Sequence, residues 1–239
     1  MIGSILLGFA LGLQHATDSD HIVAVTALAS ENGSARRSAL TGAFWGLGHL
    51  LTLFLVGSAL ILLRVRMSPR LDWALELLVA LTLIWLGVHT VRKCFAGRYH
   101  FHAHEHGARA HAHLHFHPEA EPGHVHDAHA WKNVPHGLGH GSTAVLVGMA
   151  HGLAGSGGLA LLVLASIPSR LLGLVYLIVF GVGALTGMVV FSALLGLPFS
   201  QAAKRVMWVK VMRIAAGSAS GLLGVVLAYR ALLPGAFPF

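Results

Sequence analysis

The sequence contains few charged residues. Asp, Glu, Lys and Arg together make up 10% of the 239 residues, whereas soluble domains contain about a quarter. Hydrophobic residues account for 55% of the chain, and its mean hydropathy is +0.71. The apolar residues form long blocks, several of which reach the roughly 20 residues that a helix needs to cross a bilayer. This composition excludes an ordinary soluble domain. It indicates a multi-pass membrane protein, with the lipid bilayer as a partner.

Cysteine is scarce as well. The single cysteine, Cys94, excludes an intramolecular disulfide and a cysteine-rich metal centre. The sequence also lacks a Gly-x4-Gly-Lys-Ser/Thr phosphate loop, so we expect neither ATP nor an organic cofactor. The formal charge of +7 does not indicate a nucleic-acid partner, because the Lys and Arg residues lie in short clusters between apolar blocks. Such clusters are typical of the loops that orient membrane proteins.

The apolar blocks predict an all-α fold with six transmembrane helices. The breaks between them are a Glu-Asn-Gly-Ser turn at residues 31–34, two proline-containing stretches, a cluster around residues 198–205 and a long His-rich segment. We therefore expect a first three-helix half at 1–95, a His-rich segment at 96–141 and a second three-helix half at 142–239. The predicted spans are residues 2–29, 37–63, 71–91, 142–166, 170–197 and 206–233.

The distribution of basic residues predicts the orientation in the inner membrane. Connections that retain an excess of Lys and Arg lie in the cytoplasm. Eleven basic residues lie on one side of the predicted topology and five on the other. Both termini are then expected outside and the His-rich segment inside. The larger group comprises Arg36, Arg37, Arg92, Lys93, Arg98, Arg109, Lys132, Lys204, Arg205, Lys210 and Arg213, and the smaller group Arg64, Arg66, Arg70, Arg170 and Arg230.

Short matches between the two halves indicate an internal repeat. Residues 12–15 (GLQH) resemble 148–151 (GMAH), residues 46–48 (GLG) resemble 181–183 (GVG), and Leu-Gly-Val recurs at 86 and 223. The three offsets are nearly equal and occur in the same order along the chain. Because each half has three helices, the halves would have opposite topology, as in many secondary transporters.

The first predicted span contains a dense group of ionisable residues. His15, Asp18, Asp20 and His21 fall within seven positions of an otherwise apolar stretch. Each such residue costs a few kcal/mol in hydrocarbon, so it usually faces a cavity and has a function. Imidazole nitrogens and carboxylate oxygens, without thiolate, suit divalent nickel, cobalt, zinc or copper. The alternative is a hydrogen-bonded polar cluster that joins helices.

This segment, His-Ala-Thr-Asp-Ser-Asp-His, resembles the His-x4-Asp-His signature of the nickel/cobalt transporter (NiCoT) family. It departs from the longer form, His-Ala-x-Asp-Ala-Asp-His, at Ser19. Residues 46–49 (Gly-Leu-Gly-His) resemble the second motif of that family. Since family members generally have eight spans, the chain is more similar to shorter relatives encoded beside urease or hydrogenase, which residues 148–156 also resemble. The resemblance implies transport of nickel or cobalt ions. It also implies that the metal residues are His15, Asp18, Asp20 and His21, with His49 beside them.

Helix geometry predicts a break in the first span. On a regular helix, His15 and His21 are about 9 Å apart along the axis, too far for both to bind one ion at about 2 Å. Asp20 would also point about 100° away from His21, so either Asp20 orients a histidine through its ring N–H or the helix is distorted around residues 18–20. We therefore predict a kink or an unwound turn between His15 and His21 that directs both rings into a cavity shared with His49.

Other candidate residues lie further along the chain. His151 and Ser156 are candidate pathway residues, because His151 is the repeat counterpart of His15. Residues 100–140 hold thirteen of the eighteen histidines, a composition that is typical of metal-binding, disordered segments. We expect weak capture of metal there, without one defined geometry, and a metallochaperone is a possible partner at this face. The histidines proposed for capture are His100, His102, His104, His106, His111, His113, His115 and His117.

Three functions remain open at this point. The first is uptake of nickel or cobalt, which the membrane potential can drive because entry gains about 2.3 kcal/mol per charge per 100 mV. The second is export of the same metals or of zinc. The third is a membrane-embedded metalloenzyme, or a metal-storage accessory, in which Asp18 or Asp20 serves as general base beside a metal-bound water. We expect a transporter rather than an enzyme.

Overall fold

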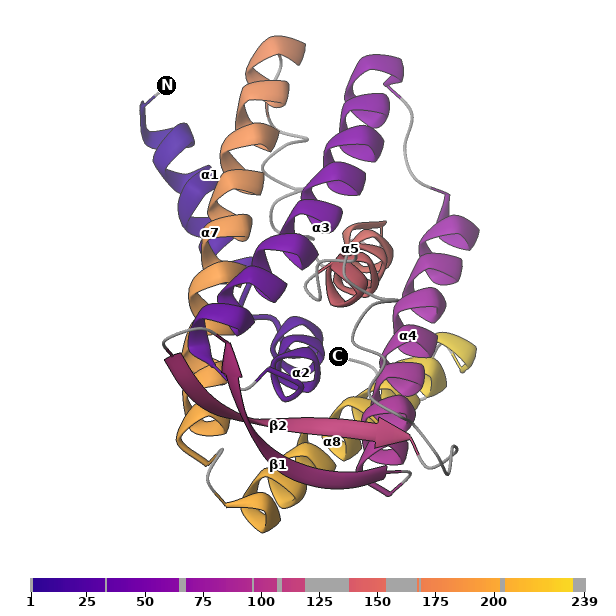
Figure 1. The fold of residues 1–239 in the computed structure, drawn as a ribbon. Helices are drawn as coiled ribbons and strands as arrows, with labels where there is room; N and C mark the ends of the chain where they lie inside the picture. The colour runs from indigo at the N-terminus through magenta and orange to yellow at the C-terminus, as the bar shows by residue number, and fades with distance from the viewer. Residues whose placement is uncertain are drawn as a thin grey trace.

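The computed structural model describes residues 2–32, 34–64, 68–95, 97–106, 109–118, 138–153, 167, 169–202 and 205–233. Its elements are arranged as seven helices and one hairpin within these ranges (Figure 1). The helices are α1 (Ile2–His15), α2 (Ser19–Ala29), α3 (Ala35–Leu63), α4 (Pro69–Phe95), α5 (Leu138–Leu153), α7 (Arg170–Ala202) and α8 (Val206–Leu232). The strands are β1 (Gly97–His106) and β2 (Arg109–Pro118).

Four of the described helices are long and apolar enough to cross a membrane: α3, α4, α7 and, from Met207, α8. On α3, Leu47, Leu51 and Leu55 form an exposed stripe at a spacing of four residues, whereas Trp45 and His49 are buried on the opposite face. A leucine stripe of this kind is what a helix presents to lipid. The protein is therefore a multi-pass membrane protein. Of the other two predicted spans, 2–29 is divided between α1 and α2, and 142–166 is described only as far as α5 extends.

The expectation of an all-α fold is correct for the membrane-spanning part and is corrected in the His-rich segment. There, β1 and β2 pair as an antiparallel two-stranded sheet. The register places His100 opposite His115, His102 opposite His113, and His104 opposite His111. Alternate residues in the sequence are histidine in both strands, and alternation of this kind is the period of a β-strand. The segment expected to be disordered therefore has a local pattern that favours strands.

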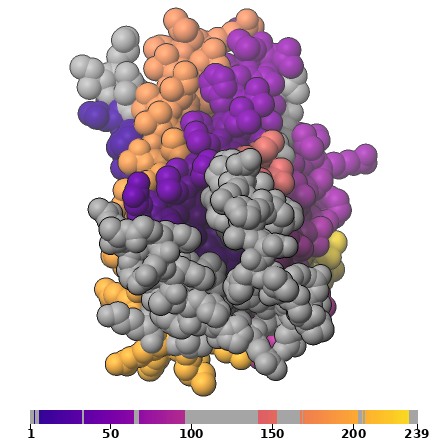
Figure 2. All heavy atoms as spheres, viewed as in Figure 1, coloured from indigo at the N-terminus to yellow at the C-terminus, as the bar shows by residue number. Residues whose placement is uncertain are grey.

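The helices pack in close pairs. α1 lies against α7, α3 lies against both α7 and α5, and α4 lies against α8. The space-filling view shows the upper ends of α3 and α7 side by side (Figure 2). Glycines permit close approaches: a Cβ atom on Gly12 would clash with the carbonyl oxygen of Phe180, and one on Gly148 would clash with that of Trp45. Small residues of this kind let transmembrane helices meet backbone to backbone.

The pair α4–α8 is joined along its length. Nε1 of Trp73 donates to the carbonyl of Ala231 at 2.6 Å, and Oγ of Ser220 donates to the carbonyl of Leu83 at 3.0 Å. Gly87 follows Leu83 by four residues on α4, and a Cβ on it would lie 2.5 Å from the backbone nitrogen of Gly221.

The first predicted span is broken after His15, as expected from helix geometry. The amide of Thr17 donates to the carbonyl of Gln14 at 2.8 Å and that of Asp18 to His15 at 3.1 Å, which tightens the last turn of α1. Asp18 then adopts φ −59° and ψ 146°, an extended conformation, and caps the start of α2. As a result α1 runs along the bundle, whereas α2 is seen nearly end on in Figure 1. The predicted break between His15 and His21 is confirmed.

We predict that Gly87→Ala destabilises the protein, whereas Gly221→Ala on the facing helix does not. A methyl group at Gly87 meets backbone atoms of α8, while a Cβ at Gly221 meets nothing within 4 Å. Overpacking of this kind costs about 1–3 kcal/mol. Thermal unfolding of both variants in detergent, followed by circular dichroism, measures the difference. Equal melting temperatures for the two variants would contradict the close α4–α8 contact.

Candidate metal centre

His15, the last residue of α1, is held by a carboxylate. Nδ1 of its ring lies 2.8 Å from Oδ2 of Asp18. An ionised carboxylate can only accept, so Nδ1 carries the proton and Nε2 is left with its lone pair. A carboxylate that orients a histidine in this way is a common partner behind metal ligands. Asp18 caps α2 through its backbone alone, because its side chain makes no capping bond and is used for His15 instead.

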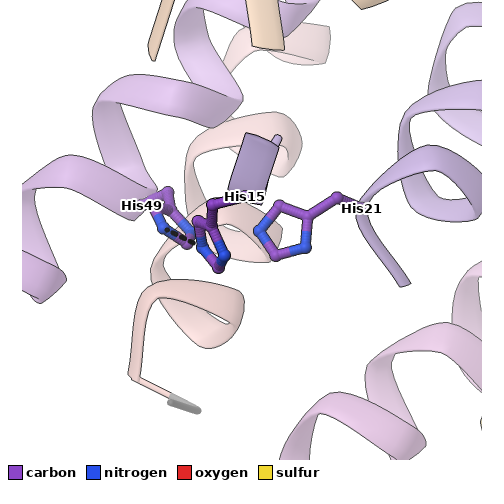
Figure 3. A group of neighbouring side chains, drawn as sticks. All are labelled: His15, His21 and His49. Carbon is purple, nitrogen blue, oxygen red and sulfur yellow. Dashed lines mark hydrogen bonds between the residues drawn. The ribbon is translucent and has the colours of Figure 1, made fainter. Parts of the chain in front are cut away.

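His49 on α3 meets the free side of His15. The two Nε2 atoms are 3.2 Å apart, and both rings are buried (Figure 3). Two nitrogen ligands of one tetrahedral ion, each about 2.0–2.1 Å from it, are separated by roughly 3.3 Å. The observed distance therefore suits two ligands of the same ion. In the absence of an ion, a proton on Nε2 of His49 satisfies the contact.

His21, in the first turn of α2, is the third ring of the group and comes from a third helix (Figure 3). Its ring centroid is 4.5 Å from that of His15 and 5.2 Å from that of His49. One nitrogen from each of the three rings lies within 4.8 Å of the other two. His21 is fully buried, and neither of its nitrogens forms a hydrogen bond with the described residues. Buried polar atoms are nearly always paired, so unpaired nitrogens at this point are consistent with ligands.

A second group shares His21 but is more accessible. Asp18, Asp20 and His21 each have a ligand atom within 4.8 Å of the others. The side chain of Asp18 is 35% exposed, that of Asp20 15%, and that of His21 0%. Oδ1 of Asp20 is 3.1 Å from Nδ1 of His21, an ion-pair distance rather than an aligned hydrogen bond. The carboxylates therefore lie on the exposed side of the histidines, where they attract cations.

The break itself favours a cation. The last carbonyl groups of α1 have no partner further along the same helix, and the C-terminal end of a helix carries a partial negative charge. The N-terminal end of α2 has the opposite sign, and Asp18 and Asp20 lie there. Broken helices of this kind form ion sites in many transporters.

The two candidate pathway residues have different outcomes. His151 on α5 is buried, and its ring centroid is 5.7 Å from that of His21. Its Nδ1 donates to the carbonyl of Val147 at 2.9 Å, which leaves Nε2 buried without a hydrogen bond to the described residues. His151 thus borders the three-histidine group without belonging to it. Ser156 lies outside the described residues.

Trp45 is a member of the cluster that sequence reasoning missed. Its side chain is fully buried, and its ring centroid is 5.1 Å from that of His21 and 5.8 Å from that of His151. Trp45 precedes His49 by four residues, so both lie on one face of α3. That spacing was the available signal.

Together, the fold and the site define a multi-pass membrane protein with a buried histidine cluster at a broken helix. The chain is 30% identical over 209 residues to the urease accessory protein UreH of Bacillus sp. (strain TB-90). The aligned residues cover 86% of this chain and 82% of that protein. The chain belongs to the family of UreH. No family profile matches the chain. No solved structure is detectably similar to it.

We predict that Asp18→Asn weakens nickel binding by about 10–100-fold, the usual effect of losing a carboxylate behind a metal-bound histidine. The amide keeps the shape of the side chain but removes the charge that fixes the proton on Nδ1 of His15. Equilibrium dialysis with radioactive nickel measures the binding, and Asp72→Asn on the exposed start of α4 is the control. Unchanged affinity in the Asp18 variant would show that this carboxylate does not support a ligand.

Proposed function

We propose that this protein transports nickel or cobalt ions across the inner membrane into the cytoplasm, as a relative of the NiCoT transporters. The observation that carries the proposal is the convergence of His15, His21 and His49 inside the helical bundle, with one nitrogen of each ring within 4.8 Å of the others. Imidazole and carboxylate ligands suit nickel and cobalt. The relationship to the urease accessory protein UreH supports nickel as the ion.

The exposures within the site suggest an order of events. An ion first meets the partly exposed carboxylates of Asp18 and Asp20 and loses part of its water there. It then passes to the three buried rings, where His21 is common to both groups. His151 lies beyond His21 on α5 and offers a free Nε2 for the next step. In this proposal the ion is the transported substrate. Its ligands are therefore exchanged one at a time, and the site does not need a high affinity for the ion.

We also propose a 3+3 inverted repeat, in which α1 corresponds to α5, α3 to α7 and α4 to α8. The glycine contacts support this pairing. Gly12 meets Phe180, and Gly148, 136 residues later, meets Trp45, 135 residues before Phe180. Likewise Gly183 lies against the carbonyl of Phe9, and its counterpart Gly48 lies against that of Val145.

In this repeat His15 corresponds to His151 in the second half. The positions that correspond to His21 and His49 are not histidines. Counting α1 with α2 as one span, and α5 as the start of the fourth, gives six spans. With eleven of the sixteen basic residues on one side, the proposed orientation places both termini outside and the His-rich segment in the cytoplasm. A divalent cation then enters down the membrane potential without ATP.

The His-rich hairpin is proposed to collect metal on the cytoplasmic side. The register of β1 and β2 pairs three histidines of one strand with three of the other. This pairing brings six histidines together along one short hairpin, and His-rich tracts are typical of metal-binding segments. The segment would then hold ions that leave the membrane site, or pass them to a metallochaperone.

We predict that His15→Ala, Asp20→Ala and His21→Ala each abolish nickel flux while the protein still inserts into the membrane. Each change removes a ligand or its charge from the site. Uptake of radioactive nickel into proteoliposomes under an inside-negative potential is the measurement, with cobalt and zinc as competitors. His89→Ala is the matched control, because this histidine stacks on Trp85 away from the cluster. Near-normal flux in one of the three variants would remove that residue from the site.

Deletion of residues 100–129 is expected to lower flux at low nickel concentration but not at saturation, because the hairpin collects ions without forming the route. A variant of unchanged length with the eight strand histidines replaced by glutamine is expected to behave in the same way. Complete loss of flux at saturating nickel in a folded deletion variant would contradict this role.

The other two functions predict different results. An exporter lowers nickel accumulation in expressing cells, whereas an importer raises it. A zinc transporter shows stronger competition by zinc than by cobalt. A metalloenzyme requires a metal-bound water and a substrate groove, and its activity would not depend on a membrane potential.

A further inference from the structure

The short helix α2 is held at its far end by two basic side chains. Nζ of Lys93, on α4, lies 2.8 Å from Oε1 of Glu31. Nε of Arg213, on α8, donates to the backbone carbonyl of Ser30 at 2.7 Å. Ser30 and Glu31 directly follow the last residue of α2. Cationic groups are favourable at this end of a helix, where carbonyl groups are free and the helix dipole is negative.

Contacts at its ends matter for α2 because the helix is short and lacks a side-chain cap. It has 11 residues, and isolated helices of this length are marginal in water. The break after His15 separates it from α1, and Asp18 gives it no side-chain cap. Its flanks pack against α8 and α7, with less contact to α3 and α4.

His21 lies at the opposite end of α2 from these two contacts. The helix is about 16 Å long, from a rise of 1.5 Å per residue. A tilt that starts at Ser30 therefore displaces the His21 ring relative to His15 and His49, which are carried by α1 and α3. Those two helices are fixed separately, since α1 packs on α7 and α3 packs on both α7 and α5.

We propose that Lys93 and Arg213 are positioning residues for the metal site: they tie the end of α2 to the α4–α8 pair and thereby place His21 against His15 and His49. This inference rests on the proposed metal site. The Lys93–Glu31 ion pair is partly accessible to solvent, with side-chain exposures of 34% for Lys93 and 21% for Glu31. This ion pair is therefore weak enough to break and re-form, so that a shift of α4–α8 changes the position of His21.

The test is a double-mutant cycle on nickel binding. The full-length chain carries Lys93→Met with Arg213→Met, in the native background and in a His21→Ala background. Equilibrium dialysis measures nickel binding, and only the part that is lost in the His15→Ala variant is assigned to the membrane site. We expect the pair of changes to weaken this binding about tenfold in the native background and less than twofold without His21, because residues that act through one partner are not additive.

A general structural defect would lower binding equally in both backgrounds, and that result would overturn the proposal. Exchange of the charges, Glu31→Lys with Lys93→Glu, is expected to restore most of the affinity lost in Lys93→Glu alone. Arg230→Met, at the other end of α8, is the control and should leave binding unchanged. If the paired variant does not fold, Lys93→Met and the charge exchange decide the question in the same way.

A metal-free measurement separates this proposal from the proposed function. Ser30 is 1% exposed, so Ser30→Cys in a Cys94→Ala background gives a buried thiol at the end of α2. Its reaction with a maleimide in nanodiscs is expected to be at least about tenfold faster when Lys93 and Arg213 are replaced. An unchanged rate would overturn the proposal even if nickel binds. Absence of nickel binding to the native protein would instead contradict the proposed function. The rate of the maleimide reaction would then decide alone whether Lys93 and Arg213 hold the end of α2.

Discussion

Burial of imidazole rings within a membrane bundle requires partners for their nitrogens, and this requirement organises the site. Asp18 fixes the proton of His15, which directs the lone pair of Nε2 toward His49. Nδ1 of His21 lies 3.1 Å from Oδ1 of Asp20 without an aligned hydrogen bond, and Nε2 of His21 has no hydrogen-bond partner among the described residues. Unpaired nitrogens cost free energy in a medium without water, so the arrangement is most stable when something binds between the rings. A divalent cation satisfies all three at once.

The broken first span follows from the same requirement. An unbroken helix would place His15 and His21 too far apart for one ion, and it would have no helix end at this point. The break supplies both the approach of the rings and a negative helix end. It also makes α2 a separate short helix, which must be held by its neighbours. The break between α1 and α2 therefore both brings the rings together and leaves α2 able to move as a separate helix.

Much of the fold and the site could be predicted from the sequence, for identifiable reasons. Composition indicated the membrane, and the density of polar residues from His15 to His21 indicated the site and its break. Trp45 was missed because an aromatic residue in an apolar helix is normally core, and only its distance of four residues from His49 distinguishes it. The contacts of Lys93 and Arg213 join residues that are 62 and 183 positions apart from their partners. No local pattern reports contacts of that range.

The hairpin is a feature that composition alone did not reveal. The His-rich composition was interpreted as favouring disorder, yet the alternation of histidine with other residues has the period of a strand in both halves of the segment. The alternation was present in the sequence, and it fits the pairing of β1 with β2.

The glycine seams between helices have a consequence for leakage. Where α1 meets α7 and α3 meets α5, the backbones touch so closely that even a methyl group does not fit. A hydrated divalent cation is far wider than a methyl group, and a chain of water molecules that could conduct protons needs comparable room. These seams are therefore closed to both. In the proposed transport, an ion passes where ligands replace its water, which is at the break and not along these two seams.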